Sequence, residues 1–78
     1  MNQRIKLSEL PIGKKAIISA FEQNEIYIKL MEMGCVPGEE ILVETIAPMG
    51  DPMAILVAGY NLSLRKNEAD NIWVEVHL

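Results

Sequence analysis

The sequence predicts a mainly β fold, a small antiparallel barrel of about five strands with one α-helix between the first and second strands. About five segments alternate apolar and polar residues with the period of a strand, and Gly- and Pro-containing turns separate them. Only residues 25–33 place apolar side chains convincingly at helical spacing. Because one helix is too few to connect parallel strands, we expect antiparallel pairing in a sheet that curls to hide its edges.

The chain opens with residues 1–6, which we interpret as a short lead-in. Ser8 can cap the next stretch, and Pro11 and Gly13 limit it to one helical turn. The apolar side chains expected to plug one end of the barrel are Leu7, Leu10 and Ile12.

Residues 25–33 form the predicted helix. Asn24 is its expected N-cap, because its side chain can accept a hydrogen bond from an early helical N–H. Gly34 supplies the left-handed residue at which a helix stops, and Pro37 prevents a restart. The apolar side chains expected to pack on the sheet are Ile26, Leu30 and Met33, with Tyr27 and Met31 widening the stripe.

Strand-like alternation recurs through the rest of the chain. A turn rich in breakers, residues 48–52, separates two strands, and Gly59 ends another. Residues 66–71 are polar and can form a helical turn capped by Asn67. The predicted strands are residues 14–21, 40–47, 53–58, 61–65 and 72–78. The inward-facing side chains of the last two are Leu62, Leu64, Ile72, Val74, Val76 and Leu78.

Length and charge restrict the class of protein. Seventy-eight residues predict a single domain, 1–78, and a net charge of −4 argues against nucleic acid as a partner. The N-terminus lacks a cationic segment followed by a long apolar run, and the apolar stretches are too short to span a bilayer. We therefore expect a cytoplasmic protein that does not insert into the membrane.

The sequence shows no catalytic constellation, so we expect neither an enzyme nor a cofactor. It has one cysteine, one histidine and no Gly-rich phosphate loop. Cys35, at the end of the helix, is expected to be a buried apolar residue, and His77 an exposed one on the last strand. A fold that brought Cys35 and His77 together would allow a nucleophile–base pair. The alternative is that they form part of an iron or zinc site.

Three motifs in order resemble the FeoA family of ferrous-iron transport proteins. They are LMEMG at residues 30–34 followed by Pro37-Gly38, APMGDP at 47–52 and LSLR at 62–65. The opening LSEL at residues 7–10 with Gly13 fits the family's usual start. The resemblance spans nearly the whole chain and implies an SH3-like barrel.

The resemblance also implies a function. It suggests a small cytoplasmic accessory of bacterial ferrous-iron uptake that regulates or assembles the transporter FeoB by docking on its cytoplasmic GTP-binding domain. It carries over no catalytic residues. The alternative is a carrier or sensor of ferrous iron or another transition metal, related to the SH3-like domain of metal-dependent repressors.

We expect the helix and the 47–52 loop to form or flank the docking surface, because both carry more apolar side chains than a solvated surface requires. Arg65-Lys66 is a solvated pair or a match for an acidic patch on the partner. An exposed terminal strand also allows a homo-oligomer. The predicted partner-binding residues are Tyr27, Met31, Met49, Asp51 and Trp73.

Overall fold

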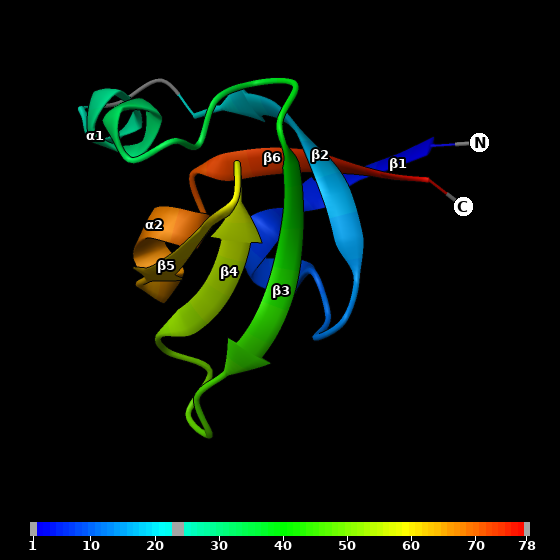
Figure 1. Cartoon of the computed structure of the whole chain (residues 1–78), viewed down its shortest axis with the longest axis vertical. Helices are drawn as coiled ribbons and strands as arrows, with labels where there is room; N and C mark the ends of the chain where they lie inside the picture. The colour runs from blue at the N-terminus through cyan, green and yellow to red at the C-terminus, as the bar shows by residue number, and fades with distance from the viewer. Residues whose placement is uncertain (1, 23–24, 78) are drawn as a thin grey trace.

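The computed structural model describes residues 2–22 and 25–77 of the chain. These residues form one curved antiparallel sheet, two short α-helices and a 3-10 turn (Figure 1). In chain order the elements are β1 (Asn2–Lys6), η1 (Leu7–Glu9), β2 (Lys15–Phe21), α1 (Ile26–Glu32), β3 (Glu40–Ile46), β4 (Met53–Val57), β5 (Tyr60–Leu64), α2 (Lys66–Ala69) and β6 (Ile72–His77).

The sheet has the order β1-β6-β2-β3-β4-β5, and every neighbouring pair is antiparallel. The mainly β, antiparallel class and the helix between β2 and β3 confirm the prediction. Irregularities in register after Ile18 on β2 and after Val43 on β3 accompany the bending of the sheet around the core. Within the described residues no ladder joins β1 to β5, so the barrel is not closed by backbone pairing.

The interpretation of residues 1–6 as a lead-in was wrong, because Asn2–Lys6 is a sixth strand. It pairs with β6 along its length, from Asn2 opposite His77 to Lys6 opposite Trp73. A strand with four polar residues among its five carries little apolar alternation, so the ladder with β6 determines its conformation rather than its own propensity.

The core confirms the inward-facing residues predicted for β5 and β6. Leu64, Ile72 and Val74 are fully buried, whereas Leu62 and Val76 are half-buried against the core. Leu78 and Asn24 lie outside the described residues. Leu7 and Leu10 are buried where η1 packs against β6 and α2. Ile12, predicted beside them, is exposed instead.

The predicted stop of α1 is present as a Schellman motif. Gly34 has φ +105°; its N–H donates to the carbonyl of Met31 at 3.1 Å, and the N–H of Cys35 donates to that of Leu30 at 3.0 Å. Leu30 and Cys35 are both fully buried, which supplies the apolar contact that accompanies this motif. The chain after α1 is therefore fixed to the core by the same residues that end the helix.

Asn67 is not the cap of α2. Arg65 is the N-cap, and its backbone N–H donates to Oε1 of Glu68 at 2.8 Å. The side chain of Glu68, at the third helical position, thus accepts the N–H of the N-cap residue, as the Glu of a capping box does.

Candidate partner-binding surface

Helix α1 stands at one end of the molecule with much of its apolar surface uncovered (Figure 1). Leu30 is its buried residue, and Ile26 and Met33 are half-buried against the core. The packed stripe is therefore narrower than predicted. Tyr27 is 38% exposed, Met31 40% and Ile28 53%. Exposed apolar side chains gathered on one short helix are typical of a surface that another protein covers.

Tyr27 and Met31 line a groove of about 490 Å³, here called the helix groove, between α1 and the end of β2. The residues around it are Ser19, Ala20, Phe21, Glu22, Tyr27, Met31 and Pro37. The fold therefore brings together two of the five residues predicted to bind a partner. An aromatic ring and a flexible thioether at an open groove can adapt to an apolar side chain of another protein.

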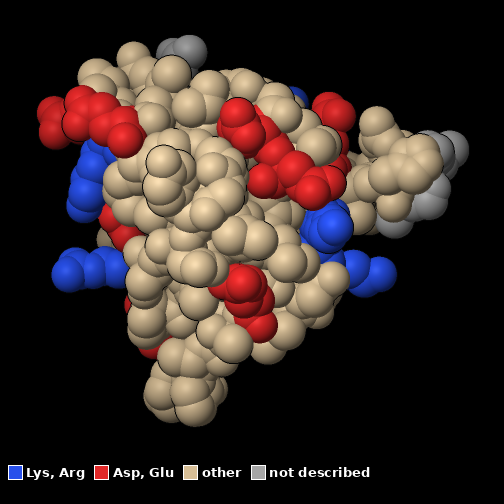
Figure 2. All heavy atoms as spheres, in the orientation of Figure 1, with Lys and Arg blue, Asp and Glu red and all other residues tan. Residues whose placement is uncertain are grey.

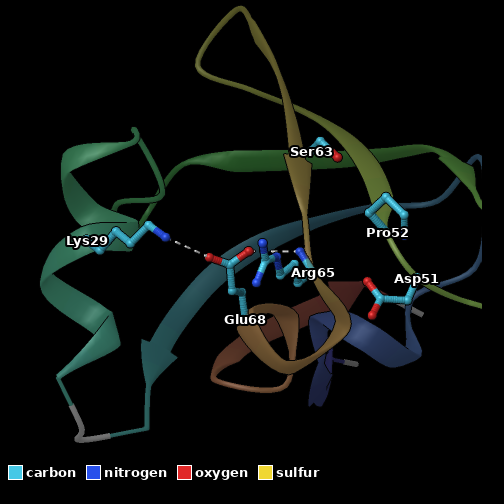
Figure 3. Close-up of a pocket in the computed structure, with 6 residues that line it drawn as sticks. All are labelled: Lys29, Asp51, Pro52, Ser63, Arg65 and Glu68. Atoms are coloured by element: carbon cyan, nitrogen blue, oxygen red, sulfur yellow. Dashed lines mark hydrogen bonds and ion pairs between the residues drawn. The ribbon is translucent and has the colours of Figure 1, made fainter.

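The other flank of α1 faces a hollow of about 710 Å³, here called the charged pocket (Figure 3). Its lining residues are Lys29, Asp51, Pro52, Ser63, Arg65 and Glu68. Asp51 is the predicted partner residue found here. Its Oδ1 accepts a hydrogen bond from the backbone N–H of Lys66 at 3.0 Å, so the carboxylate joins the β3–β4 loop to the start of α2.

Glu68 and Lys29 connect the two helices across the charged pocket. The Lys29 ammonium lies 3.3 Å from Oε2 of Glu68, and the two side chains point toward one another in Figure 3. Glu68 is only 7% exposed. The backbone N–H of Arg65, and then the charge and hydrogen bond of Lys29, hold the pKa of Glu68 below its ordinary value despite this burial. Glu68 is thus a buried anion stabilised by specific partners.

Met49 and Trp73 line neither hollow, although Trp73 contacts Glu22, a lining residue of the helix groove. Met49 is 90% exposed in the loop between β3 and β4, which projects at the end of the molecule away from α1 (Figure 1). Trp73 lies on the outer side of β6 and is half-buried. Side chains of β1 cover its ring.

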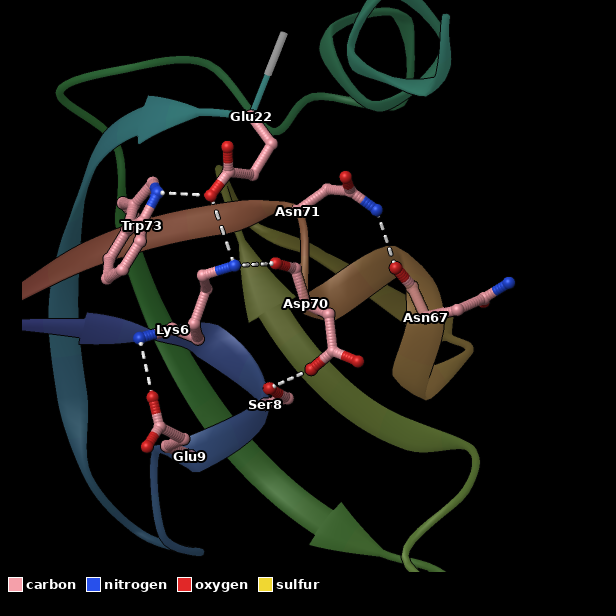
Figure 4. Close-up of polar contacts among 8 residues, drawn as sticks. All are labelled: Lys6, Ser8, Glu9, Glu22, Asn67, Asp70, Asn71 and Trp73. Carbon is pink, nitrogen blue, oxygen red and sulfur yellow. Dashed lines mark hydrogen bonds and ion pairs between the residues drawn. The ribbon is translucent and has the colours of Figure 1, made fainter. Parts of the chain in front are cut away.

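Around Trp73, the side chains of Arg4, Lys6 and Glu22 form a set of polar contacts, here called the polar staple, that connects β1 to β6. The Arg4 guanidinium and the Lys6 ammonium lie 5.1 and 4.7 Å from the centre of a Trp73 ring. The indole Nε1–H donates to Oε1 of Glu22 at 3.1 Å, and Lys6 pairs with the same oxygen at 3.2 Å (Figure 4). Hydrogen bonds from Lys6 and Trp73 lower the pKa of Glu22. These contacts of Trp73 join β1 and Glu22 to β6.

Lys6 also donates to the carbonyl oxygen of Asp70 at 2.7 Å, and the Ser8 hydroxyl donates to the Asp70 carboxylate (Figure 4). These bonds attach the N-terminal segment to the end of α2. Together with the staple, they explain why residues 2–6 are held on the sheet.

Cys35 and His77 are not brought together. Cys35 is fully buried beneath α1, and desolvation, with the nearby charge of Glu68, raises the pKa of its thiol to about 11. His77 is exposed at the end of β6, which lies on the side of the molecule away from α1 (Figure 1), and its Nδ1 lies 2.9 Å from Oδ1 of Asn2. The described residues contain no group of three or more His, Cys, Asp or Glu side chains that could hold a metal ion.

For two residues of the charged pocket, no sequence pattern indicated that they belong to a site. Glu68 occurs in a polar run that predicts a solvated helical turn, and Ser63 occurs on the outer side of a strand. Glu68 stands three positions after the N-cap residue, as the Glu of a capping box does. The other half of that pattern, Ser or Thr at the N-cap, is missing because Arg65 occupies the position. Arg65 was predicted only as part of the Arg65-Lys66 pair, and nothing in the sequence placed Lys29 beside it.

The family model for the FeoA domain matches residues 5–76. The chain belongs to the FeoA family. This confirms the resemblance drawn from the three motifs, and it identifies the chain as a ferrous-iron transport accessory and not an enzyme.

Two solved FeoA-type structures share its fold. An NMR structure of a FeoA-like protein from Clostridium acetobutylicum is 46% identical, with a TM-score of 0.91 over 100% of this chain and 92% of that one. The crystal structure of Stenotrophomonas maltophilia FeoA complexed with zinc, described as a prokaryotic SH3 domain protein, is 31% identical with a TM-score of 0.79. It covers 90% of this chain and 88% of that one. The fold is therefore the SH3-like fold of FeoA.

A curated relative is a fusion of Fe(2+) transport protein A with the Fe(2+) transporter FeoB from Porphyromonas gingivalis. It is 40% identical over 73 residues, which cover 92% of this chain and 9% of that protein. The chain thus corresponds to a small part of the length of this relative. In the part of this chain that the structure describes, none of the helices is long and apolar enough to cross a bilayer.

Proposed function

We propose that this FeoA-family chain acts as one cytoplasmic docking module, residues 1–78, in bacterial ferrous-iron uptake. It binds the cytoplasmic GTP-binding part of FeoB and regulates or assembles the transporter. The observation that carries this proposal is the Porphyromonas gingivalis fusion, in which a homologue of this chain and FeoB form one polypeptide. A protein that works beside the transporter when fused is expected to bind it when separate, because fusion only raises the effective concentration.

The uncovered face of α1 is the contact surface that we favour. Tyr27 and Met31 offer apolar contact at the helix groove, and Ile28 extends it across the helix. Aromatic and other large apolar side chains contribute most of the binding energy in protein interfaces. Met49 on its exposed loop is a second, separate contact point in this proposal.

Titration calorimetry of the purified protein with the cytoplasmic domain of FeoB tests the proposal, with anaerobic ferrous iron as a second titrant. We expect saturable binding to the domain and none to ferrous iron alone. Ile28→Asp should weaken binding to the domain by about tenfold or more, because it places a charge in an apolar contact.

Ile12→Asp is the matched control. Ile12 is 57% exposed, close to the exposure of Ile28, but lies in the loop after η1, away from α1. Equal loss of affinity in both variants would contradict the assignment of α1. Binding of ferrous iron without binding of the domain would contradict the docking function and support a metal carrier instead.

A further inference from the structure

Among the described residues, no strand pairs with the outer edge of β5. β5 ends the strand order, and it joins β4 through the two-residue turn Ala58-Gly59. Such a turn makes Val57 and Tyr60 a hydrogen-bonded pair, and pairing alternates along an antiparallel ladder. The backbone N–H and C=O groups of Asn61 and Ser63 therefore point away from β4. An edge of this kind is a template on which an extended segment of another chain can add a strand.

The charged pocket adjoins this edge, and its carboxylates are already engaged. Glu68 accepts hydrogen bonds from Arg65 N–H and from Lys29, and Asp51 accepts one from the backbone of Lys66. The Arg65 side chain differs. It is exposed and lines the pocket, and neither ion pair found among the described residues includes its guanidinium. The charge of Arg65 favours the ionised form of Glu68, but its guanidinium is held by neither of these ion pairs. It is therefore the cation of the pocket that a ligand can approach, on a wall that Ser63 also lines.

The charge around Arg65 contrasts with that of the whole chain, which is −4. Figure 2 shows basic side chains on two opposite sides of the molecule, one of them the side where α1, α2 and β5 lie, while acidic side chains are spread across the face between them. Lys29 and Lys66 accompany Arg65 there. A guanidinium binds a carboxylate through two parallel N–H···O bonds, so it favours an acidic side chain of a partner.

We propose that the β5 edge and the charged pocket receive an extended acidic segment of a protein partner. The segment adds a strand beside Asn61 and Ser63, and one of its Asp or Glu carboxylates binds Arg65. This inference rests on the proposed function, in which the partner is the cytoplasmic part of the transporter. It adds a second contact, of defined chemistry, to the apolar face of α1.

Two substitutions separate the two halves of the contact. Arg65→Gln removes the guanidinium charge, and Ser63→Pro removes an N–H that faces away from β4, where an edge strand tolerates proline. Lys14→Gln is the control for net charge, since Lys14 is exposed and outside the pocket, and Ser63→Thr is the control for the strand. An ¹H–¹⁵N correlation spectrum of each variant verifies that it is folded.

Each variant is titrated with the cytoplasmic domain of FeoB and, separately, with a short peptide of alternating Val and Glu. A peptide with Gln in place of Glu is the reference. We expect Arg65→Gln and Ser63→Pro each to weaken binding of the domain and of the Val/Glu peptide about tenfold or more, with both controls near wild type. Amide shifts should concentrate on β5 and on residues 65–68.

The outcomes separate this inference from the proposed function. If the domain binds wild type and Arg65→Gln equally well, the acidic contact is overturned and the docking module stands. If the domain does not bind but the Glu peptide does, with dependence on Arg65, the site stands and the transporter is the wrong partner. If the protein binds neither the domain nor the Glu peptide, the proposed site and the docking module are both overturned. Displacement of the peptide by millimolar phosphate would overturn the claim that the segment adds a strand to β5, and would show that the site binds small anions instead.

Discussion

At the residue scale, Glu68 has the most unusual environment among the described residues. It is the buried charged residue of the core region, and its carboxylate joins the cap of α2 to the ammonium of Lys29 on α1. A buried carboxylate is stable only where hydrogen bonds and an opposite charge compensate for lost hydration. Both are present, so Glu68 connects the helix of the proposed contact surface to the rest of the molecule.

Stability should therefore depend on pH through Glu68. Its pKa in the folded state lies below the ordinary value of 4.5, so its contribution is fully present above pH 4.5 and is lost as the pH falls through the lowered pKa. Urea unfolding of wild type and Glu68→Gln measures this contribution. We expect the wild type to be more stable at pH 7 and the difference to shrink below pH 4.5.

Glu44→Gln is the reference for this experiment, because Glu44 is exposed on β3. A difference between wild type and Glu68→Gln that does not change between pH 7 and pH 3 would contradict the role given to the carboxylate charge.

At the scale of elements, α1 is too short to be stable by itself. Seven residues form about two turns, and isolated helices of this length are marginal in water. Its stability comes from Leu30 in the core, from the Schellman motif and from the Lys29–Glu68 pair. The presentation of Tyr27, Ile28 and Met31 consequently depends on how the helix ends.

Gly34→Ala tests that dependence. At φ +105° an alanine is strained, although nothing lies within 4 Å of the added methyl group, so the cost arises in the backbone. We expect a loss of about 1 kcal/mol in the free energy of unfolding, measured by chemical denaturation. Gly34→Asn should cost less, because asparagine tolerates left-handed conformations better. Equal stability of wild type and Gly34→Ala would argue against the motif.

At the scale of the whole molecule, one core is shared by the sheet, η1 and both helices. The fully buried side chains come from both ends of the chain and from every strand except β1. β1 contributes the half-buried Ile5 and is held through β6 and Trp73. Because protein interiors are densely packed, a cavity in this shared core destabilises the whole sheet rather than one element.

Leu64→Ala should therefore lower the free energy of unfolding by about 2–5 kcal/mol, since Leu64 is fully buried at the end of β5. Leu62→Ala, two residues earlier on the same side of the strand and only half-buried, should cost distinctly less. Guanidinium denaturation of both variants measures the difference. A larger loss for Leu62→Ala would mean that the core lies elsewhere along β5.

The sequence by itself determined the class of fold and most of its elements. Strands β2 to β6 follow from two-residue alternation, because one side of each faces a core, and α1 ends where Gly34 and Pro37 require. The family also followed from three motifs: two lie at a helix end and a turn, where backbone geometry restricts the residue type, and the third lies on β5. The β4–β5 turn was less evident, because Ala58, at φ +52°, occupies a position at which asparagine or glycine is usual.

Only the tertiary structure decided the polar contacts. β1 is a strand because β6, Trp73 and Glu22 provide partners for its backbone and cations, and none of these is near it in sequence. The charged pocket likewise needs Lys29 and Glu68, which are 39 positions apart. Local propensity and periodicity depend only on residues that are near one another in the sequence. Charges are paired by residues that meet only after the sheet has formed, so their partners were not predictable from sequence patterns.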